Sequence, residues 1–135
     1  MVVKTFYAKT DSLDEVVEFL DEQLEEVDCP IKTKLQLDVA VEEVFINIAS
    51  YAYHPDVGTV EITVGITENP KTAVISFSDS GKPFNPLEKP DPDITLSAEE
   101  REIGGLGIYM VKKTMDDVRY EFKNGRNCLT IEKKL

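Results

Sequence analysis

One long stretch of helical pattern constrains the fold more than any other feature of the sequence. From Thr33 to Tyr53 there is no glycine or proline, and apolar residues recur at steps of three and four. A helix this long and this apolar has to lie in the core, against a second layer of structure. The stretch ends at His54-Pro55, since the residue before a proline avoids helical geometry. Its apolar positions are Leu37, Ala40, Val41, Val44, Ile48 and Ala52.

Shorter patterns on both sides of this helix predict strands and two further helices. A capping box, Ser12-x-x-Glu15, opens a helix over about residues 12–27, and a third helix begins near Gly107. Asn124-Gly125 is a strong hairpin turn. Strands are expected at residues 2–8, 60–66 and 73–77, and on both sides of that turn, at 118–122 and around Leu129 and Ile131.

The order of these elements indicates the fold class. The strands are grouped instead of alternating one by one with helices, which favours an α+β fold. We expect a two-layer sandwich, with the helices on one face of a largely antiparallel sheet. The length of 135 residues suits a single domain over residues 1–135.

Charge and composition exclude several classes of protein. The chain has 15 basic and 26 acidic residues, so its net charge is −11. This argues against a nucleic-acid binder and against docking on an anionic membrane. No apolar run approaches the roughly 20 residues of a membrane span, and the first residues lack the order of a signal peptide. We therefore expect a cytoplasmic protein that binds neither nucleic acid nor membrane.

Cysteine and histidine are too scarce for two common kinds of site. Cys29 and Cys128 form no metal-binding spacing, so we expect two free thiols in a reducing compartment. His54 is the only histidine. A Ser-His-Asp triad or a multi-histidine zinc site would have to be built around it, which argues against both.

The first segment with chemical potential lies inside the long helix. Glu43 and Asn47 are four residues apart and so share one helix face. Phosphoryl transfer needs an oxygen ligand for Mg²⁺ and a carboxylate that orients or deprotonates a nucleophile, and these two residues could supply both. The alternative is an ordinary solvated Glu and Asn. Glu43 and Asn47 interrupt a helix that is otherwise too apolar to be exposed, which argues against this alternative.

The second segment follows a predicted strand and begins at Asp79. An ionised carboxylate only accepts hydrogen bonds, so Asp79 could take the exocyclic amino hydrogen of adenine. Gly81 would let a base come close to the backbone. The alternative is a plain Asp-Ser-Gly turn.

The third segment, Gly104-Gly105-Leu106-Gly107, opens the last helix. Free backbone N–H groups and the helix dipole at such a start make an anion site, and glycines let phosphate oxygens come near. The segment is neither a P-loop nor a dinucleotide fingerprint, and its alternative is a set of flexible glycines. The residues before it, from Ser80 to Gly105, follow no regular pattern and carry four prolines and a charged run. A loop this long is usually functional or disordered.

Together, and in this order, the three segments resemble the GHKL superfamily of ATP-binding domains. Within it, the sequence is most similar to the bacterial anti-sigma-factor serine/threonine kinases. Three stretches carry the resemblance: Glu43–Tyr53 with its Glu-x-x-x-Asn pattern, Asp79–Pro86, and Gly105–Asp116. The resemblance extends from about Leu35 to Leu135 and implies the GHKL ATP-binding fold.

The resemblance implies a role for each matching residue. Glu43 would be the catalytic base, and Asn47 would ligate Mg²⁺. Asp79 and Gly81 would bind the adenine of ATP. The loop at about residues 86–103 would be the ATP lid. The phosphates would contact the glycine segment, Gly104, Gly105, Leu106 and Gly107, and the cation of the lid, Arg101. The hydroxyl of Thr130, in the last strand, would join the adenine network.

Two departures and three functional hypotheses accompany the resemblance. Ile48 stands where the family often has a small residue, and Tyr51 where many members have histidine.

The leading hypothesis is a Mg-ATP-dependent serine kinase that phosphorylates a STAS-type anti-anti-sigma protein and sequesters a sigma factor; the resemblance also implies a homodimer. The second is a nucleotide-gated binding module without phosphoryl transfer. The third is a detached histidine-kinase catalytic domain, against which stands the lack of a histidine-bearing dimerisation segment.

Overall fold

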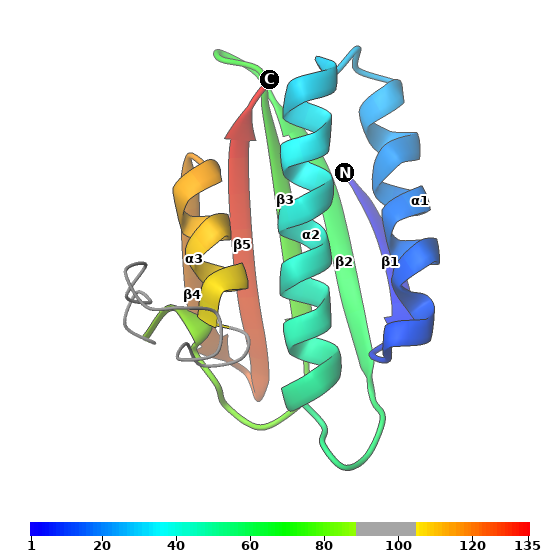
Figure 1. The fold of residues 1–135 in the computed structure, drawn as a ribbon, viewed down its shortest axis with the longest axis vertical. Coiled ribbons are helices and arrows are strands. Elements are labelled where there is room, and N and C mark those ends of the chain that lie inside the picture. Colours follow the sequence, from blue (N-terminus) through cyan, green and yellow to red (C-terminus); the bar gives the residue numbers. More distant parts are fainter. Residues whose placement is uncertain (89–104) are drawn as a thin grey trace.

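The computed structural model, which describes residues 1–88 and 105–135, has two layers (Figure 1). One layer is a five-stranded sheet in the order β1-β2-β3-β5-β4, in which every neighbouring pair is antiparallel. The helices of the described residues cover one face of the sheet. The predicted α+β sandwich is therefore confirmed. The elements are β1 (Val2–Tyr7), α1 (Leu13–Glu25), α2 (Ile31–Tyr51), β2 (Thr59–Thr67), β3 (Thr72–Asp79), α3 (Gly105–Thr114), β4 (Asp117–Lys123) and β5 (Arg126–Lys134).

The core lies between α2 and the middle of the sheet. Strands β3 and β5 alternate buried and half-buried residues, so their buried side chains face the helices. Phe45 of α2 and Phe77 of β3 are 0% and 1% exposed. Helix α2 is long and apolar because it packs on the sheet while α1 and α3 flank it (Figure 1). No helix in the described part of the chain is long and apolar enough to cross a bilayer.

The boundaries of the first two helices differ from the sequence prediction. The capping box at Ser12 is wrong, because Ser12 ends a 3-10 turn (Thr10–Ser12) and its side chain makes no capping hydrogen bond. Its φ of −85° and ψ of −5° are helical, whereas a capping side chain needs an extended backbone. Helix α2 begins at Ile31, directly after Pro30, whose carbonyl accepts the first bond from the Lys34 amide at 2.9 Å.

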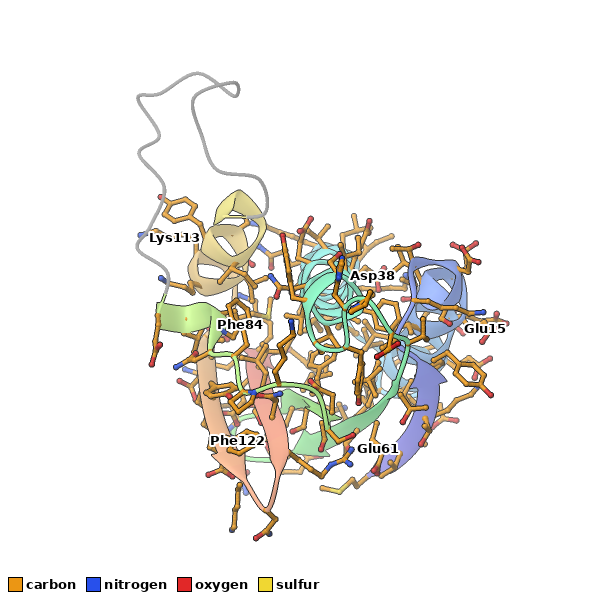
Figure 2. The ribbon with its side chains drawn as sticks, turned by 90° about the horizontal axis from the view of Figure 1, so that it is seen from below. Glu15, Asp38, Glu61, Phe84, Lys113 and Phe122 are labelled. Carbon is orange, nitrogen blue, oxygen red and sulfur yellow. The ribbon has the colours of Figure 1, made fainter. Side chains whose placement is uncertain are left out.

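Two acidic residues meet one lysine where α1 packs against α2. Lys34 Nζ lies 3.2 Å from Asp21 Oδ1 and 3.2 Å from Asp38 Oδ2. Burial, followed by the neighbouring Asp21 carboxyl, raises the pKa of Asp38 from 3.8 to about 6. Figure 2, viewed from below, shows Asp38 in the helical layer and Glu61 on the sheet side.

The topology gathers three chain segments at one end of the molecule. The ends of α2 and β3 lie beside the start of β5 at the bottom of Figure 1, and α3 begins higher up, alongside α2. The register pairs Asp79, the last residue of β3, with Asn127 in β5. This end is where the predicted functional residues of α2 and β3 are brought together.

Candidate functional site

A pocket opens at this end of the molecule, between the helices and the sheet. The space between its lining atoms, including the part open to solvent, is about 430 Å³. Apolar side chains such as Phe77, Ile108 and Leu129 form most of its wall. Its polar groups come from Asn47, Asp79, Lys82, Tyr120 and Asn127. A largely apolar pocket with a few convergent polar groups is the usual form of a small-molecule site.

Asp79 lies in this pocket because of its position in β3. Every second residue of the strand faces the core, and Asp79 continues that series at 3% exposure. Its Oδ1 accepts hydrogen bonds from the Gly81 amide at 2.9 Å and from Asn127 Nδ2 at 3.0 Å. A nearly buried carboxylate held in this way is a fixed acceptor inside an apolar pocket.

Asn127 organises the polar part of the pocket, and the sequence analysis missed it. Its Nδ2 donates to Asp79 and, at 2.9 Å, to the Lys82 carbonyl. Its Oδ1 accepts from the Phe84 amide at 3.1 Å and from the Tyr120 hydroxyl. One signal could have identified it. Asn127 occupies the next inward position before Leu129 and Ile131, where the alternation calls for an apolar residue.

Tyr120 of β4 completes this hydrogen-bonded group. Burial raises the pKa of its phenol, and the carboxylates of Asp79 and Glu88 add to the shift, against a backbone hydrogen bond to Phe84 that lowers it. The phenol therefore stays protonated and donates to Asn127. Figure 2 shows Phe84 between α3 and the sheet.

The loop after β3 is pressed against the end of α2. The Lys82 amide donates to the Ala52 carbonyl at 3.0 Å. A Cβ added at Gly81 would overlap that same carbonyl. Gly81 is thus required by the close approach of α2, and its expected approach to a base remains a prediction. The contact fixes the loop beside Asp79 from the helical side.

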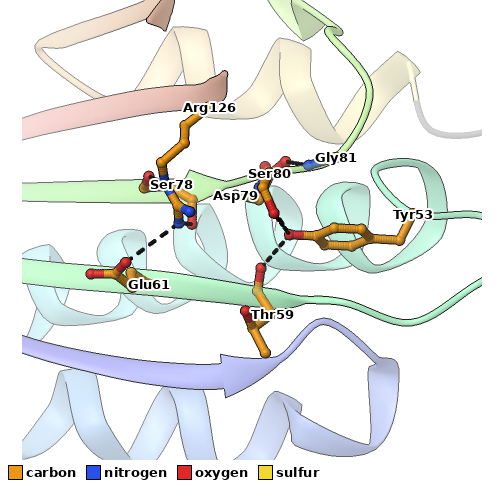
Figure 3. Close-up of polar contacts among 8 residues, drawn as sticks. All are labelled: Tyr53, Thr59, Glu61, Ser78, Asp79, Ser80, Gly81 and Arg126. Atoms are coloured by element: carbon orange, nitrogen blue, oxygen red, sulfur yellow. Dashed lines mark hydrogen bonds and ion pairs between the residues drawn. The ribbon is translucent and has the colours of Figure 1, made fainter. Parts of the chain in front are cut away.

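Tyr53 holds the same loop from the other side (Figure 3). Its hydroxyl donates to the Thr59 carbonyl at 2.6 Å and accepts from the Ser80 amide at 2.9 Å. A Cβ at Gly58 would overlap the Tyr53 ring, so Gly58 makes room for it. The residue after Asp79 is therefore tied to the start of β2 through one phenol.

The structure brings Asn47 and Glu43 to two neighbouring places along α2. Asn47 lines the pocket. Glu43, one turn earlier, packs against the first turn of α3, where a Cβ at Gly107 would overlap its carboxylate. Burial, followed by the charge of Glu42, raises the pKa of Glu43. A carboxylate with a raised pKa beside a pocket is a candidate general base.

The glycine segment is described only in part. Gly105, Leu106 and Gly107 form the first turn of α3, whose amides lack partners within the helix. What a side chain at Gly107 would meet is Glu43, so this glycine makes room for a carboxylate of the protein itself. Gly104, Arg101 and residues 89–103 of the expected lid lie outside the described residues. The start of that lid, Pro86–Glu88, is a 3-10 turn.

Thr130 does not belong to this pocket, which corrects the role expected for it. It alternates with the buried Leu129 and Ile131 and so faces the side of the sheet away from the helices. There its hydroxyl pairs with the Ser76 hydroxyl at 3.0 Å. Because side chains alternate between the two faces of β5, Asn127 and not Thr130 belongs to the polar network of the pocket.

Both departures from the family pattern fall in the pocket wall. Ile48 and Tyr51 line the pocket. The Tyr51 ring lies 6.2 Å from the Phe84 ring, centroid to centroid, at an angle of 41°. Two aromatic rings therefore line the same pocket as the Asp79 carboxylate, a combination that suits a flat heterocycle.

Comparison with known proteins agrees with this geometry. Residues 6–133 match the family described as the histidine kinase-like ATPase domain. The chain belongs to this family. This ATPase domain is 32% identical over 95 residues to the serine-protein kinase RsbW of Bacillus thuringiensis strain Al Hakam, and 32% identical to that of Bacillus anthracis. Each match covers 69% of this chain and 59% of the relative.

A solved structure shows the same fold. The RsbU and RsbW domains of a Mycobacterium tuberculosis protein superpose with a TM-score of 0.65 at 16% identity, covering all of this ATPase domain and 33% of that chain. The resemblance to the anti-sigma-factor kinase family and the GHKL-type fold is therefore confirmed. The domain spans about three-fifths of the length of the curated RsbW relatives.

Proposed function

We propose that the protein is an ATP-dependent serine/threonine kinase that phosphorylates a STAS-type anti-anti-sigma protein and sequesters a sigma factor in the cytoplasm. One observation carries the proposal: Glu43 lies against the first turn of α3, one helical turn from Asn47 in the pocket. In this proposal Asp79 would accept a hydrogen bond from adenine, Asn47 would ligate the metal and Glu43 would be the base. The similarity to RsbW kinases supports the choice of substrate class.

The pocket fits the base of ATP. Asp79 offers an acceptor to the exocyclic amino group, and Asn127 with the Gly81 amide keeps that carboxylate in place. Tyr51, Phe77 and Phe84 give aromatic walls. An adenine bound there would bury its ring and satisfy its amino group together.

The neighbouring residues fit phosphates and Mg²⁺. Among the described residues, no group of three or more His, Cys, Asp or Glu could hold a metal. A site for Mg²⁺ with one protein ligand is still suitable, because this ion usually keeps several waters and is completed by substrate phosphates. Asn47 would supply the protein oxygen, and the first-turn amides of α3 would donate to the phosphates. Bound Mg-ATP supplies the phosphoryl group to be transferred.

Glu43 would act on the other reactant. It would orient the acceptor hydroxyl and take its proton as that oxygen becomes the nucleophile. Its raised pKa makes it a stronger base than a fully solvated glutamate. Most of the rate enhancement in phosphoryl transfer comes from positioning and electrostatics, so Glu43 is one contributor among several.

The test combines nucleotide binding with phosphate transfer. Calorimetry should give binding of Mg-ATP that Asp79→Asn weakens about tenfold or more, because the amide leaves a mismatched buried pair. Incubation with γ-labelled ATP should place label on serine or threonine of a STAS-domain protein from the same genome. ATP binding without transfer to any of these proteins would favour the non-catalytic binding module.

A further inference from the structure

A second concave surface lies on the outer side of α2 and α3. We call it the α2/α3 groove, and the space along it, including the part open to solvent, is about 910 Å³. It shares no residue with the pocket that contains Asp79. Ala40 and Val111 form its buried floor. Its rims are Ile31, Leu35 and Val39 from α2, and Met110 and Thr114 from α3.

The rims of the α2/α3 groove expose large apolar side chains. Ile31, Leu35 and Val39 are 77%, 57% and 52% exposed, and Met110 on the opposite rim is 44% exposed. The three from α2 are spaced by four residues and so form one stripe along the helix. A contiguous apolar surface of this kind marks an interaction site more often than scattered exposed residues do. The core does not account for these side chains.

The groove leads to Glu43. The stripe Ile31, Leu35, Val39 reaches Glu43 at its next step of four, and Glu43 packs against Gly107 at the start of α3. The two helices run in opposite directions (Figure 1). The contact between Glu43 and Gly107 therefore lies beyond the Val39 end of the groove, and Ile31 lies at the other end. A segment lying in the groove would therefore reach the proposed base.

The charged residue that lines the groove, among the residues described, is basic in an otherwise acidic protein. It is Lys32, at the far end of the groove; Lys112 and Lys113 lie in the last turn of α3, outside the lining. The first turn of α2 has no acidic residue. In a chain with a net charge of −11, this is a local reversal of sign. It favours a partner with acidic residues at that end.

We infer that the α2/α3 groove docks an amphipathic helix of the phosphoryl-acceptor protein. Its apolar face would cover Leu35, Val39 and Met110, its acidic end would meet Lys32 and the end of α3, and its other end would bring the hydroxyl to Glu43. This inference rests on the proposed kinase function. The twelve steps from Ile31 to Glu43 span about 18 Å, which suits a partner helix of about three turns. Only the acceptor has to reach Glu43, which favours it over a sigma factor or a second copy.

The experiment measures phosphate transfer by the full chain to a STAS-domain protein that the wild type phosphorylates. Leu35→Glu and Met110→Glu place a charge on each rim in turn. Each should raise the KM for the STAS protein about tenfold or more, as truncation of an interface hot spot does. The kcat and the ATP dissociation constant should stay within about twofold of the wild type. Val57→Glu is the matched control, because Val57 is 59% exposed in the connection after α2 and outside the groove.

Three outcomes would overturn the inference. An unchanged KM in both rim variants, with normal transfer by the wild type, would overturn the docking site and leave the kinase proposal standing. Failure of the wild type to phosphorylate any STAS-domain protein would overturn both. A wild-type dimer that Leu35→Glu converts to a monomer in sedimentation would assign the groove to a second copy of this chain. Lys32→Glu gives an independent check, because it should raise the KM and weaken its dependence on salt.

Discussion

Replacing Asn127 with alanine should weaken both the fold and the nucleotide site. The substitution removes a long hydrogen bond from Nδ2 to the Gly81 carbonyl, at 3.4 Å, and four shorter ones: those from Nδ2 to Asp79 and to the Lys82 carbonyl, and those to Oδ1 from the Phe84 amide and the Tyr120 hydroxyl. Asn127 is 6% exposed, so its partners are left in a nearly closed space. Each lost bond costs about 1 kcal/mol net, and a buried group left without a partner costs more.

The expected loss in the free energy of unfolding is about 2–4 kcal/mol. The sum of four bonds gives about 4 kcal/mol, and water entering the open pocket would restore part of it. Urea unfolding measures this loss directly. Because Asp79 also loses one of its two fixed donors, ATP affinity in calorimetry should fall about tenfold.

Thr130→Ala is the matched control in the same strand. It removes one hydroxyl pair, with Ser76, on the opposite side of the sheet, so it should cost about 1 kcal/mol and leave ATP affinity unchanged. If Asn127→Ala were no less stable than Thr130→Ala and bound ATP like the wild type, the role given to Asn127 would be refuted.

Three further substitutions test separate parts of the site and fold. Gly107→Ala should displace the Glu43 carboxylate, lower the free energy of unfolding and slow phosphate transfer. Adding Glu43→Ala should restore the free energy of unfolding measured in urea, because the added Cβ overlaps the Glu43 side chain. Tyr53→Phe removes two hydrogen bonds to the backbone, so it should cost about 1–2 kcal/mol of stability in urea and weaken ATP binding in calorimetry. Asp38, whose folded pKa is raised to about 6, contributes stability that is present below its unfolded pKa and lost as the pH rises through about 6. As the pH rises from about 4 to 7, the free energy of unfolding of Asp38→Asn should therefore rise by about 1–2 kcal/mol relative to that of the wild type, a range reduced because the side chain is partly exposed. Urea titrations at several pH values measure this change, and a difference in stability that does not vary with pH would contradict it.

Elements with a strong local pattern could be predicted from the sequence. The Asn124-Gly125 turn is an example, since both residues have positive φ, 54° and 75°, as a type I′ hairpin requires. Helix α2 could be predicted because its apolar spacing recurs from Leu37 to Ala52, over about four turns. The Ser12 capping box failed because a sequence pattern does not reveal the backbone conformation that a cap needs.

The polar network of the site was less predictable, because it depends on contacts between distant strands. Asp79 stands directly after an apolar strand, and that position made it conspicuous. Asn127 meets it only through the β3–β5 register, across 48 residues of sequence. The role expected for Thr130 came from the resemblance alone, whereas its position between the buried Leu129 and Ile131 turns its side chain to the other side of the strand. The contact between Glu43 and Gly107 joins two helices, and neither pattern alone indicates it.

The most direct test of the central claim separates catalysis by Glu43 from nucleotide binding. Glu43→Gln keeps the shape of the side chain and removes the base. Single-turnover transfer to the STAS-domain substrate should slow about 10²–10⁴-fold, the usual share of general base catalysis, while ATP affinity stays close to that of the wild type.

Glu42→Gln is the control, because its charge raises the pKa of Glu43. It should keep the transfer rate near neutral pH, and it should move the acid limb of the pH–rate profile to lower pH. If a folded Glu43→Gln variant that binds ATP transferred phosphate at the wild-type rate, the account would be contradicted.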